Sequence, residues 1–183
     1  MKRILIALIL AAVPIIGSAQ ELAPIVKREA DSCAIALLKS DYEGVARYTH
    51  ERLIKVMGGK DQMIAEIKRG ISQMHTAGFD FIETKTGTPA EPKRVGSWLT
   101  SLVPTTVVMK VPDGRRMSKD SFLLGISEDN GKTWVFVDLS NITNEQYAEL
   151  FPELVREIPL PAKKKAVFVN EKEPNQASPL GKI

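Results

Sequence analysis

The sequence predicts an α+β fold in which N-terminal helices pack on a mainly antiparallel sheet. Apolar residues recur at helical spacing between Gln20 and Gly78, whereas short apolar runs alternate with turn residues between Phe79 and Ser140. Most of these runs are joined by connections short enough for hairpins, and strands joined in this way are antiparallel. Helices that precede a meander of strands pack on one face of the sheet.

The segment Ser121–Ser140 is the clearest structural unit of the chain. Two apolar runs, Phe122–Ile126 and Trp134–Leu139, flank a polar stretch that contains Asn130-Gly131. Asn-Gly supplies the positive φ angles of a tight hairpin turn. Because both runs are apolar on both of their faces, the sequence predicts a hairpin at the centre of the sheet, covered on both sides.

Four helices are expected before the first strand. The first is amphipathic, with its apolar residues on one side and its charged residues on the other. Ser40 and Glu43 have the spacing of a capping box, which opens a short second helix. Gly58-Gly59 allows the chain to reverse before the longest helix. The expected helices are Glu21–Lys39, a short helix through Tyr48, Glu51–Met57 and Lys60–Thr76.

Three residues of these helices have specific expected roles. Cys33 is the only cysteine, so an internal disulfide is excluded, and its place on the apolar stripe predicts a buried, unreactive thiol. Leu37 and Ile67 are expected to link the first and the long helix to the sheet.

Five strands are expected after the helices. Runs rich in valine, threonine and aromatic residues are typical of strands, and Asp113-Gly114 marks a turn between the two strongest. The expected strands are Phe79–Thr84, Lys93–Trp98, Leu102–Val111, Arg116–Ser127 and Lys132–Ser140.

The N-terminus has the pattern of a secretory signal peptide. A basic start, Met1–Arg3, precedes the apolar run Ile4–Ile16, which is too short to span a bilayer. Small residues follow, and they predict cleavage after Ala19. A cysteine for lipid attachment would have to follow the small residues, but Gln20 stands there. We therefore expect a soluble protein, periplasmic or secreted, with no stable membrane anchor.

The charge balance of the mature chain argues against nucleic acid as a partner. The full chain of 183 residues has 25 basic and 22 acidic residues. Removal of residues 1–19 takes away Lys2 and Arg3 and no acid, which leaves 23 basic residues and a net charge of about +1. Nucleic-acid binding usually requires a clear excess of basic residues.

The C-terminal end has a different composition. Thr143 and Gln146 form a capping-box pair that opens a short helix ending before Pro152. The rest alternates prolines with charges, which is typical of a solvated tail, and only Ala166–Val169 has strand character. The expected organisation is a signal peptide (1–19), one α+β domain (20–151) and a proline- and lysine-containing tail (152–183).

The order of these elements resembles the nuclear transport factor two-like superfamily, which includes ketosteroid isomerases and polyketide cyclases. The resemblance covers residues 21–140. It implies a cone-shaped half-barrel, with a pocket between the helices and the concave sheet that hosts enzymes, ligand binders or interaction modules. The residues that carry it are Ser40–Ala46, Leu53, Gly58–Lys60 and Asp129–Trp134.

The isomerases of this superfamily use a carboxylate base with an acidic oxyanion hole. Neither histidine has a second ligand at helical spacing, so we expect no metal, and no cofactor motif is present. No spacing among the available residues reproduces a catalytic pattern. The candidate bases are Asp80, Asp120 and Asp138, the candidate donors are Tyr42, Tyr48 and Tyr147, and the histidines are His50 and His75.

Two functions remain open on the sequence. The favoured one is an exported, non-catalytic module that binds a small apolar ligand or a protein partner, with Tyr48, His50 and Trp98 as ligand contacts. The alternative is a small cofactor-free isomerase or cyclase that uses a pocket carboxylate. A carboxylate with a raised pKa that meets a tyrosine or histidine in the main cavity would favour the enzyme.

One face of the central hairpin needs a cover that the N-terminal helices do not supply. An apolar sheet face left in water is unusual for a monomer. The expected covers are a second copy of the chain, packed sheet to sheet as a homodimer, or the segment Ala166–Val169 folded back. We favour the homodimer, because symmetric pairing buries a large patch without ordering a proline-rich tail.

The signal-peptide interpretation predicts the N-terminus of the exported protein. Intact-mass measurement of periplasmic or secreted material should give a chain that begins at Gln20, because the small residues before it are read by signal peptidase. A product that retains Met1 would contradict the interpretation.

Overall fold

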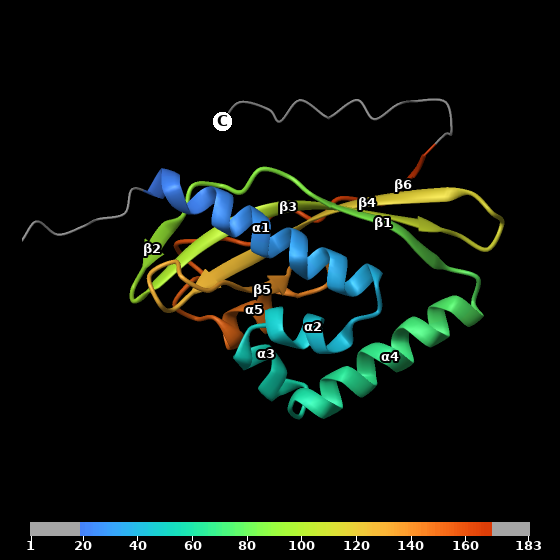
Figure 1. The fold of residues 1–183 in the computed structure, drawn as a ribbon, viewed down its shortest axis with the longest axis horizontal. Helices are drawn as coiled ribbons and strands as arrows, with labels where there is room; N and C mark the ends of the chain where they lie inside the picture. The colour runs from blue at the N-terminus through green and yellow to red at the C-terminus, as the bar shows by residue number, and fades with distance from the viewer. Residues whose placement is uncertain (1–18, 170–183) are drawn as a thin grey trace, which may run out of the picture.

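The structure, a computed structural model, describes residues 19–169 of the chain, so the predicted signal peptide lies almost entirely outside the described residues. The described part forms helices on a curled antiparallel half-barrel sheet (Figure 1), which confirms the predicted α+β class. The elements are α1 (Ala19–Leu38), α2 (Tyr42–Tyr48), α3 (Glu51–Val56), α4 (Lys60–Thr76), β1 (Asp80–Thr86), β2 (Lys93–Val95), β3 (Trp98–Lys110), β4 (Arg116–Ser127), β5 (Val135–Asp138), α5 (Asn144–Leu150) and β6 (Val167–Val169).

The sheet is built around the long β3–β4 hairpin. These two strands pair from Lys110 with Arg116 to Leu99 with Ser127. β1 and β2 both pair with β3 on one side, and β5 and β6 both pair with β4 on the other. β5 is therefore an edge strand, and only β4 of the predicted central hairpin lies inside the sheet. A register shift in β1 after Phe81 interrupts its ladder with β3, and such irregularities bend a strand.

Helix α1 covers one face of the sheet. Its residues Val26 and Ala30 are fully buried, and they pack with Val103 of β3 and with Trp134 and Phe136 of the β4–β5 hairpin. Cys33 lies at the border of this cluster. Burial raises the pKa of the Cys33 thiol to about 12, which keeps it protonated and supports the expected unreactive role.

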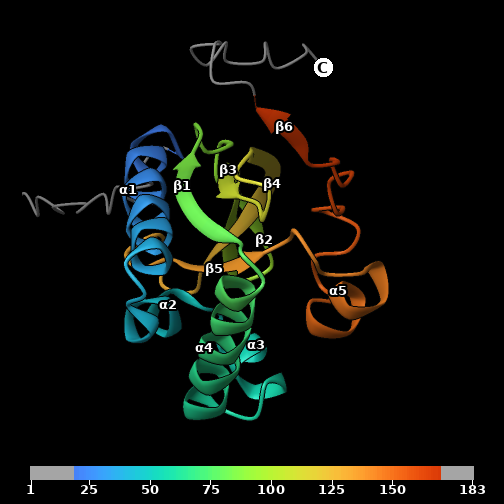
Figure 2. The ribbon, with the colours of Figure 1, turned by 90° about the vertical axis from the view of Figure 1, so that its right-hand side faces the viewer.

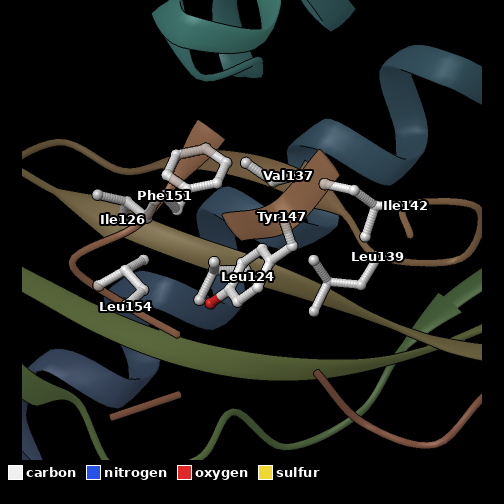
Figure 3. Packing of buried hydrophobic residues seen from close by; sticks show 8 residues of the cluster. All are labelled: Leu124, Ile126, Val137, Leu139, Ile142, Tyr147, Phe151 and Leu154. Carbon is white, nitrogen blue, oxygen red and sulfur yellow. The ribbon is translucent and has the colours of Figure 1, made fainter. Parts of the chain in front are cut away.

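The opposite face of the sheet is covered by α5 and the segment that follows it, as Figure 2 shows with α1 and α5 on opposite sides. Phe151 and Leu154 are fully buried, and they pack with Leu124, Ile126 and Val137 of the sheet (Figure 3). Both faces of the predicted hairpin are thus covered, as expected. The cover is neither of the two that were expected, a second copy or the segment Ala166–Val169, because α5 and residues 151–160 provide it.

The predicted tail therefore divides into two parts. Residues 152–160 had been expected to be solvated, but Leu154 is fully buried, and Ile158 and Leu160 pack against the same cluster. Val167–Val169 forms β6 at the far end of β4, with its side chains 37–60% exposed, so it does not cover the central apolar face. The reason for expecting a homodimer, an apolar sheet face without a cover, therefore no longer holds. The homodimer stays a prediction that this structure does not test.

Helix α4 packs on α2 and α3 (Figure 1). Met63 and Ile64 are buried against Ala46 of α2, and Ile67 lies beside them. The expectation that Ile67 links the long helix to the sheet was therefore wrong, and Leu37 of α1 is only half-buried. A helix can show a regular apolar stripe and bury it against other helices, and the stripe alone does not identify the surface that it meets.

A closed network of hydrogen bonds holds the loop between β4 and β5. The carboxylate of Asp129 accepts bonds from the hydroxyl of Ser127 at 2.8 Å, and from the backbone and hydroxyl of Thr133 at 2.9 and 2.7 Å. Partial burial works to raise the pKa of Asp129, but these hydrogen bonds outweigh it and lower the pKa to about 2. The carboxylate is therefore ionised at all ordinary pH values and fixes the loop.

The same loop docks α1 on the sheet. Asn130 and Gly131 both have positive φ angles, as predicted from their sequence. The indole of Trp134 donates to the carbonyl of Gly131 at 3.2 Å, and a Cβ at Gly131 would lie only 2.7 Å from Leu22 of α1. Glycine is required here by its φ angle and by the close approach of α1.

Substitution of Leu154 tests whether residues 151–160 belong to the core. Leu154→Ala should lower the free energy of unfolding by about 2–5 kcal/mol, because a fully buried leucine leaves a cavity. The neighbouring Val155 is 39% exposed, so Val155→Ala should stay within about 0.5 kcal/mol of the wild type. Denaturant unfolding measures both values. Equal losses for the two variants would place this segment outside the core.

Candidate functional site

His50 is a buried histidine at the junction of α2 and α3. Its backbone N–H donates to the carbonyl of Phe136 in β5 at 3.1 Å, beside a bridge between Thr49 and the same residue. Its side chain caps α3, because Nδ1 accepts a hydrogen bond from the backbone N–H of Arg52 at 3.2 Å. Only 2% of His50 is exposed. These contacts tie the start of α3 to the edge of the sheet.

Aromatic rings enclose the imidazole of His50. Trp98 and Phe151 both meet it edge to face, with ring centroids 5.7 and 5.0 Å away. Nε2 of His50 has no hydrogen-bond partner among the described residues, and the carboxylate of Glu128 lies 3.7 Å from it. Because Nδ1 accepts a bond, the neutral ring carries its proton on Nε2.

Burial lowers the pKa of His50, and this effect is larger than the opposing attraction of Glu128. Arg52 lowers the pKa further, whereas Glu51 and Glu153 raise it slightly. Protonation would also require Nδ1 to donate, which would break the cap of α3. The site therefore favours neutral imidazole, a structural rather than an acid–base arrangement.

Arg52 connects α3 to the end of α5. Its guanidinium lies over Trp98, 4.7 Å from the ring centroid, and 5.8 Å from that of Phe151. It donates to the carbonyl of Leu150 at 2.8 Å and forms a two-pronged ion pair with Glu153 at 2.9 and 3.0 Å. A planar guanidinium makes both kinds of contact at once. This link sets the spacing between the two helices.

An apolar groove lies between α3, β5 and α5. Leu53 and Leu150 stand on its two helical sides, and Val137 of β5 is part of its lining. Val56 is 69% exposed at the groove, the highest exposed fraction among the large hydrophobic residues of the described chain. The groove has a volume of about 380 Å³ and is open to solvent. Its lining is completed by Ile142, Asp138, Asn141, Gln146 and Glu149.

A second hollow of similar volume lies on the other side of Ile142. Leu139 and Leu160 contribute apolar surface, but its lining is more polar and includes Thr143 and Glu145 near the start of α5. It is the less suitable of the two for an apolar ligand, because ligand sites are predominantly apolar with a few placed polar groups.

The structure brings together two of the three residues predicted to contact a ligand. His50 and Trp98 lie in contact, but Phe151 and Arg52 fill the space around them. Tyr48 packs on Phe136, with ring centroids 6.5 Å apart, on the α1 side of the sheet. These three residues are not part of the groove lining. The sequence does show apolar residues in α3 and α5. They could predict the groove only with the knowledge that α5 packs on the sheet beside α3.

The predicted catalytic candidates are spread over the molecule. Asp80 lies 2.5 Å from His75, and both side chains are about half exposed. Asp120 accepts a bond from Thr106 on β3. The hydroxyl of Tyr147 donates to the carbonyl of Ile158, and burial raises its pKa to about 12.

Asp138 is the one candidate base in the groove lining, which also includes Glu149. Asp138 stands opposite Leu123 of β4, which turns its side chain to the α1 face of the sheet. It accepts a bond from the backbone of Ser140. The lining contains no tyrosine and no histidine. A carboxylate base and an oxyanion donor therefore do not meet in this groove. No group of three or more potential metal ligands occurs within residues 19–169.

Comparison with known protein families finds no match to this chain, and no curated protein matches it either. Between Ala19 and Val169, no helix combines the length and apolar character that crossing a membrane requires. The fold and the groove are therefore the observations from which function is inferred.

The pH dependence of stability tests the environment of His50. Because burial lowers its pKa, the unfolded chain binds a proton more readily than the folded chain below the ordinary value of 6.5. The contribution of neutral His50 to the free energy of unfolding is therefore complete above pH 6.5. This contribution is lost as the pH falls towards the lower pKa that His50 has in the folded chain. We expect the free energy of unfolding to fall between about pH 7 and about pH 5, less steeply in His50→Asn, which retains a capping side chain.

The other histidine provides the control. His75 is half exposed, and His75→Asn removes the second imidazole without touching the buried cluster. His50→Asn should change the slope of the free energy of unfolding against pH by the same amount in the wild-type background and in the His75→Asn background. Identical slopes for the wild type and His50→Asn would contradict the description of His50 as a buried neutral ring.

Proposed function

We propose that this chain is an exported, non-catalytic member of the nuclear transport factor two-like superfamily that binds a small apolar ligand. Helices followed by a curled antiparallel half-barrel sheet are compatible with that superfamily. The N-terminal sequence pattern supports export. Fold alone does not define function, so the proposal rests on the groove.

The observation that carries the proposal is the apolar groove between α3, β5 and α5. Its volume of about 380 Å³ lies in the range of small-molecule sites. Leu53, Val56, Val137, Ile142 and Leu150 supply its apolar surface. A recessed apolar surface of this kind, with an exposed valine beside it, gains free energy when a ligand removes it from water.

The way the groove is built also suits binding. Val137 is 1% exposed and Ile142 is 8% exposed, so both are part of the core. Arg52 joins the two helical sides through the carbonyl of Leu150 and through Glu153. A site whose walls are fixed before binding spends less free energy on ordering them.

Val56→Gln tests the proposal with a neutral fluorescent probe such as N-phenyl-1-naphthylamine. Wild-type protein should bind the probe, and Val56→Gln should weaken binding by about fivefold, because it replaces apolar contact surface by an amide. Val56 is exposed, so the substitution leaves the core intact.

Val155→Gln is the matched control. Val155 is an exposed valine after α5 that is not part of the groove lining, so this variant should bind the probe like the wild type. No binding by the wild type, or equal binding by both variants, would contradict the proposed function.

A further inference from the structure

Basic residues gather at one end of the sheet, where β6 pairs with the first residues of β4. This pairing joins residues 110–120 to residues 161–169, and we call the two segments together the basic end. β6 lies on the side of the molecule away from α2, α3 and α4 (Figures 1 and 2). The basic end contains Lys110, Arg115, Arg116, Lys119 and Lys163–Lys165, with Asp113 and Asp120 as its acids.

The charge of the described chain is therefore unevenly distributed. Residues 19–169 contain 21 basic and 20 acidic residues, and the basic end has seven of the basic and two of the acidic ones. Its net charge is +5, whereas the other described residues have a net charge of −4. The nearly neutral total of the mature chain conceals this asymmetry, because the two basic segments lie far apart in the sequence.

Two of the seven cations are neutralised within the basic end. Arg115 forms an ion pair with Asp113 at 2.7 Å, and Lys164 forms one with Asp120 at 3.3 Å. The other five cations form no ion pair with another described residue. These five are Lys110, Arg116, Lys119, Lys163 and Lys165.

Some of these cations stand beside one another. Lys110 of β3 and Arg116 of β4 are direct cross-strand partners, and like charges in that arrangement are destabilising. Asp80 is opposite Lys110 on β1, but its carboxylate is hydrogen-bonded to His75. An anionic surface over the pair would relieve the repulsion.

More cations meet at the outer edge of β4, which is unpaired at residues 119–121 between β5 and β6. Lys119, Lys163 and Lys164 line a small hollow there. Lys119 also approaches the amide oxygen of Asn141 at 3.4 Å, a neutral group that leaves its charge uncompensated. The cations thus extend along the margin of the sheet rather than around one enclosed site.

Exposed apolar side chains accompany these cations on β6. Val167 is 60% exposed, Phe168 is 53% exposed and Val169 is 37% exposed. The guanidinium of Arg115 lies 3.7 Å from the ring centroid of Phe168, so charge and apolar surface are in direct contact. Lysine and arginine mixed with aromatic and aliphatic side chains are typical of surfaces that bind at the bilayer interface.

We propose that the basic end binds reversibly to the surface of an anionic phospholipid bilayer, with β6 at the level of the headgroups. Each lysine or arginine near such a surface strengthens binding by about fivefold. The negative remainder of the chain is repelled, which orients α2, α3 and α4 away from the lipid. This contact is peripheral, and it is independent of the groove and of the ligand proposed for it.

Cosedimentation with lipid vesicles tests the inference, with the exported chain that begins at Gln20. Vesicles of phosphatidylcholine with about 30 mol% phosphatidylglycerol should bind the chain at least about tenfold more tightly than vesicles of phosphatidylcholine alone. Added salt should reduce this preference, because the cations are solvent-exposed. Equal binding to the two kinds of vesicle would overturn the proposal.

A triple variant removes three unpaired, exposed cations of the basic end: Arg116→Gln, Lys163→Gln and Lys165→Gln. We expect its affinity for the phosphatidylglycerol vesicles to fall at least about tenfold, because each cation contributes to the attraction. Phe168→Ser, made separately, should weaken binding by about threefold, since less apolar surface enters the headgroup region. Unchanged binding by Phe168→Ser would contradict the placement of β6 at the headgroups.

The matched control removes one arginine and two lysines from other parts of the surface. Lys39→Gln, Arg47→Gln and Lys132→Gln change three exposed residues outside the basic end, with the same change in net charge. This variant should bind the vesicles within about twofold of the wild type. A loss as large as that of the first triple variant would show that net charge, not the basic end, causes binding.

Soluble polyglutamate distinguishes a bilayer from an acidic polypeptide. If the chain binds the phosphatidylglycerol vesicles and polyglutamate at the same concentration does not displace it, the proposal is supported. If the chain binds polyglutamate but neither kind of vesicle, the partner of the basic end is an acidic polypeptide and the proposal is overturned. Either result leaves the probe-binding test of the groove unaffected.

Discussion

Burial of both faces of β4 is the constraint on which the rest of this structure depends. Leu123 faces the cluster under α1, whereas Leu124 and Ile126 face the cluster under α5, and all three are less than a tenth exposed. A strand that is apolar on both faces needs a cover on each. One cover precedes the sheet in the chain and the other follows it, so α1 and α5 lie on opposite sides (Figure 2).

The groove is a consequence of that arrangement. α5 covers its sheet face from beyond the edge strand β5, and α3 is tied to the same edge by the backbone bond of His50 to Phe136. Arg52 then joins α3 to the end of α5, and the space between them has Val137 of β5 in its lining. The residues that fix the distance between α3 and α5 are thus polar, while those that line the groove are mostly apolar. This division is typical of binding sites whose walls are fixed independently of the ligand.

Local patterns predicted the elements of this fold well. The capping pair Thr143 and Gln146, the positive φ angles of Asn130-Gly131 and the two-sided apolar strands all act over a few residues, and the structure confirms them. The second cover was missed because composition was used to judge residues 152–160. Two prolines there suggested solvation, yet an irregular segment buries Leu154 while its backbone forms turn hydrogen bonds.

The candidate site shows the same division between local and long-range information. His50 and Trp98 were both expected near a ligand and do lie together, but Phe151, the residue that follows α5, fills the space between the elements. Tyr48, two residues before His50, faces the α1 side instead. The groove exists because α5 packs beside α3 and β5. The sequence pattern of α3 or α5 alone does not predict where α5 packs.

Methyl-resolved nuclear magnetic resonance during titration with 1-decanol tests the central claim, that the groove is the ligand site. The account predicts saturable shifts of the methyl signals of Leu53, Val56 and Leu150, with no change at Val26 under α1. Shifts confined to Val167 and Val169 of the exposed β6 strand, or no saturable shift at any methyl group, would contradict it.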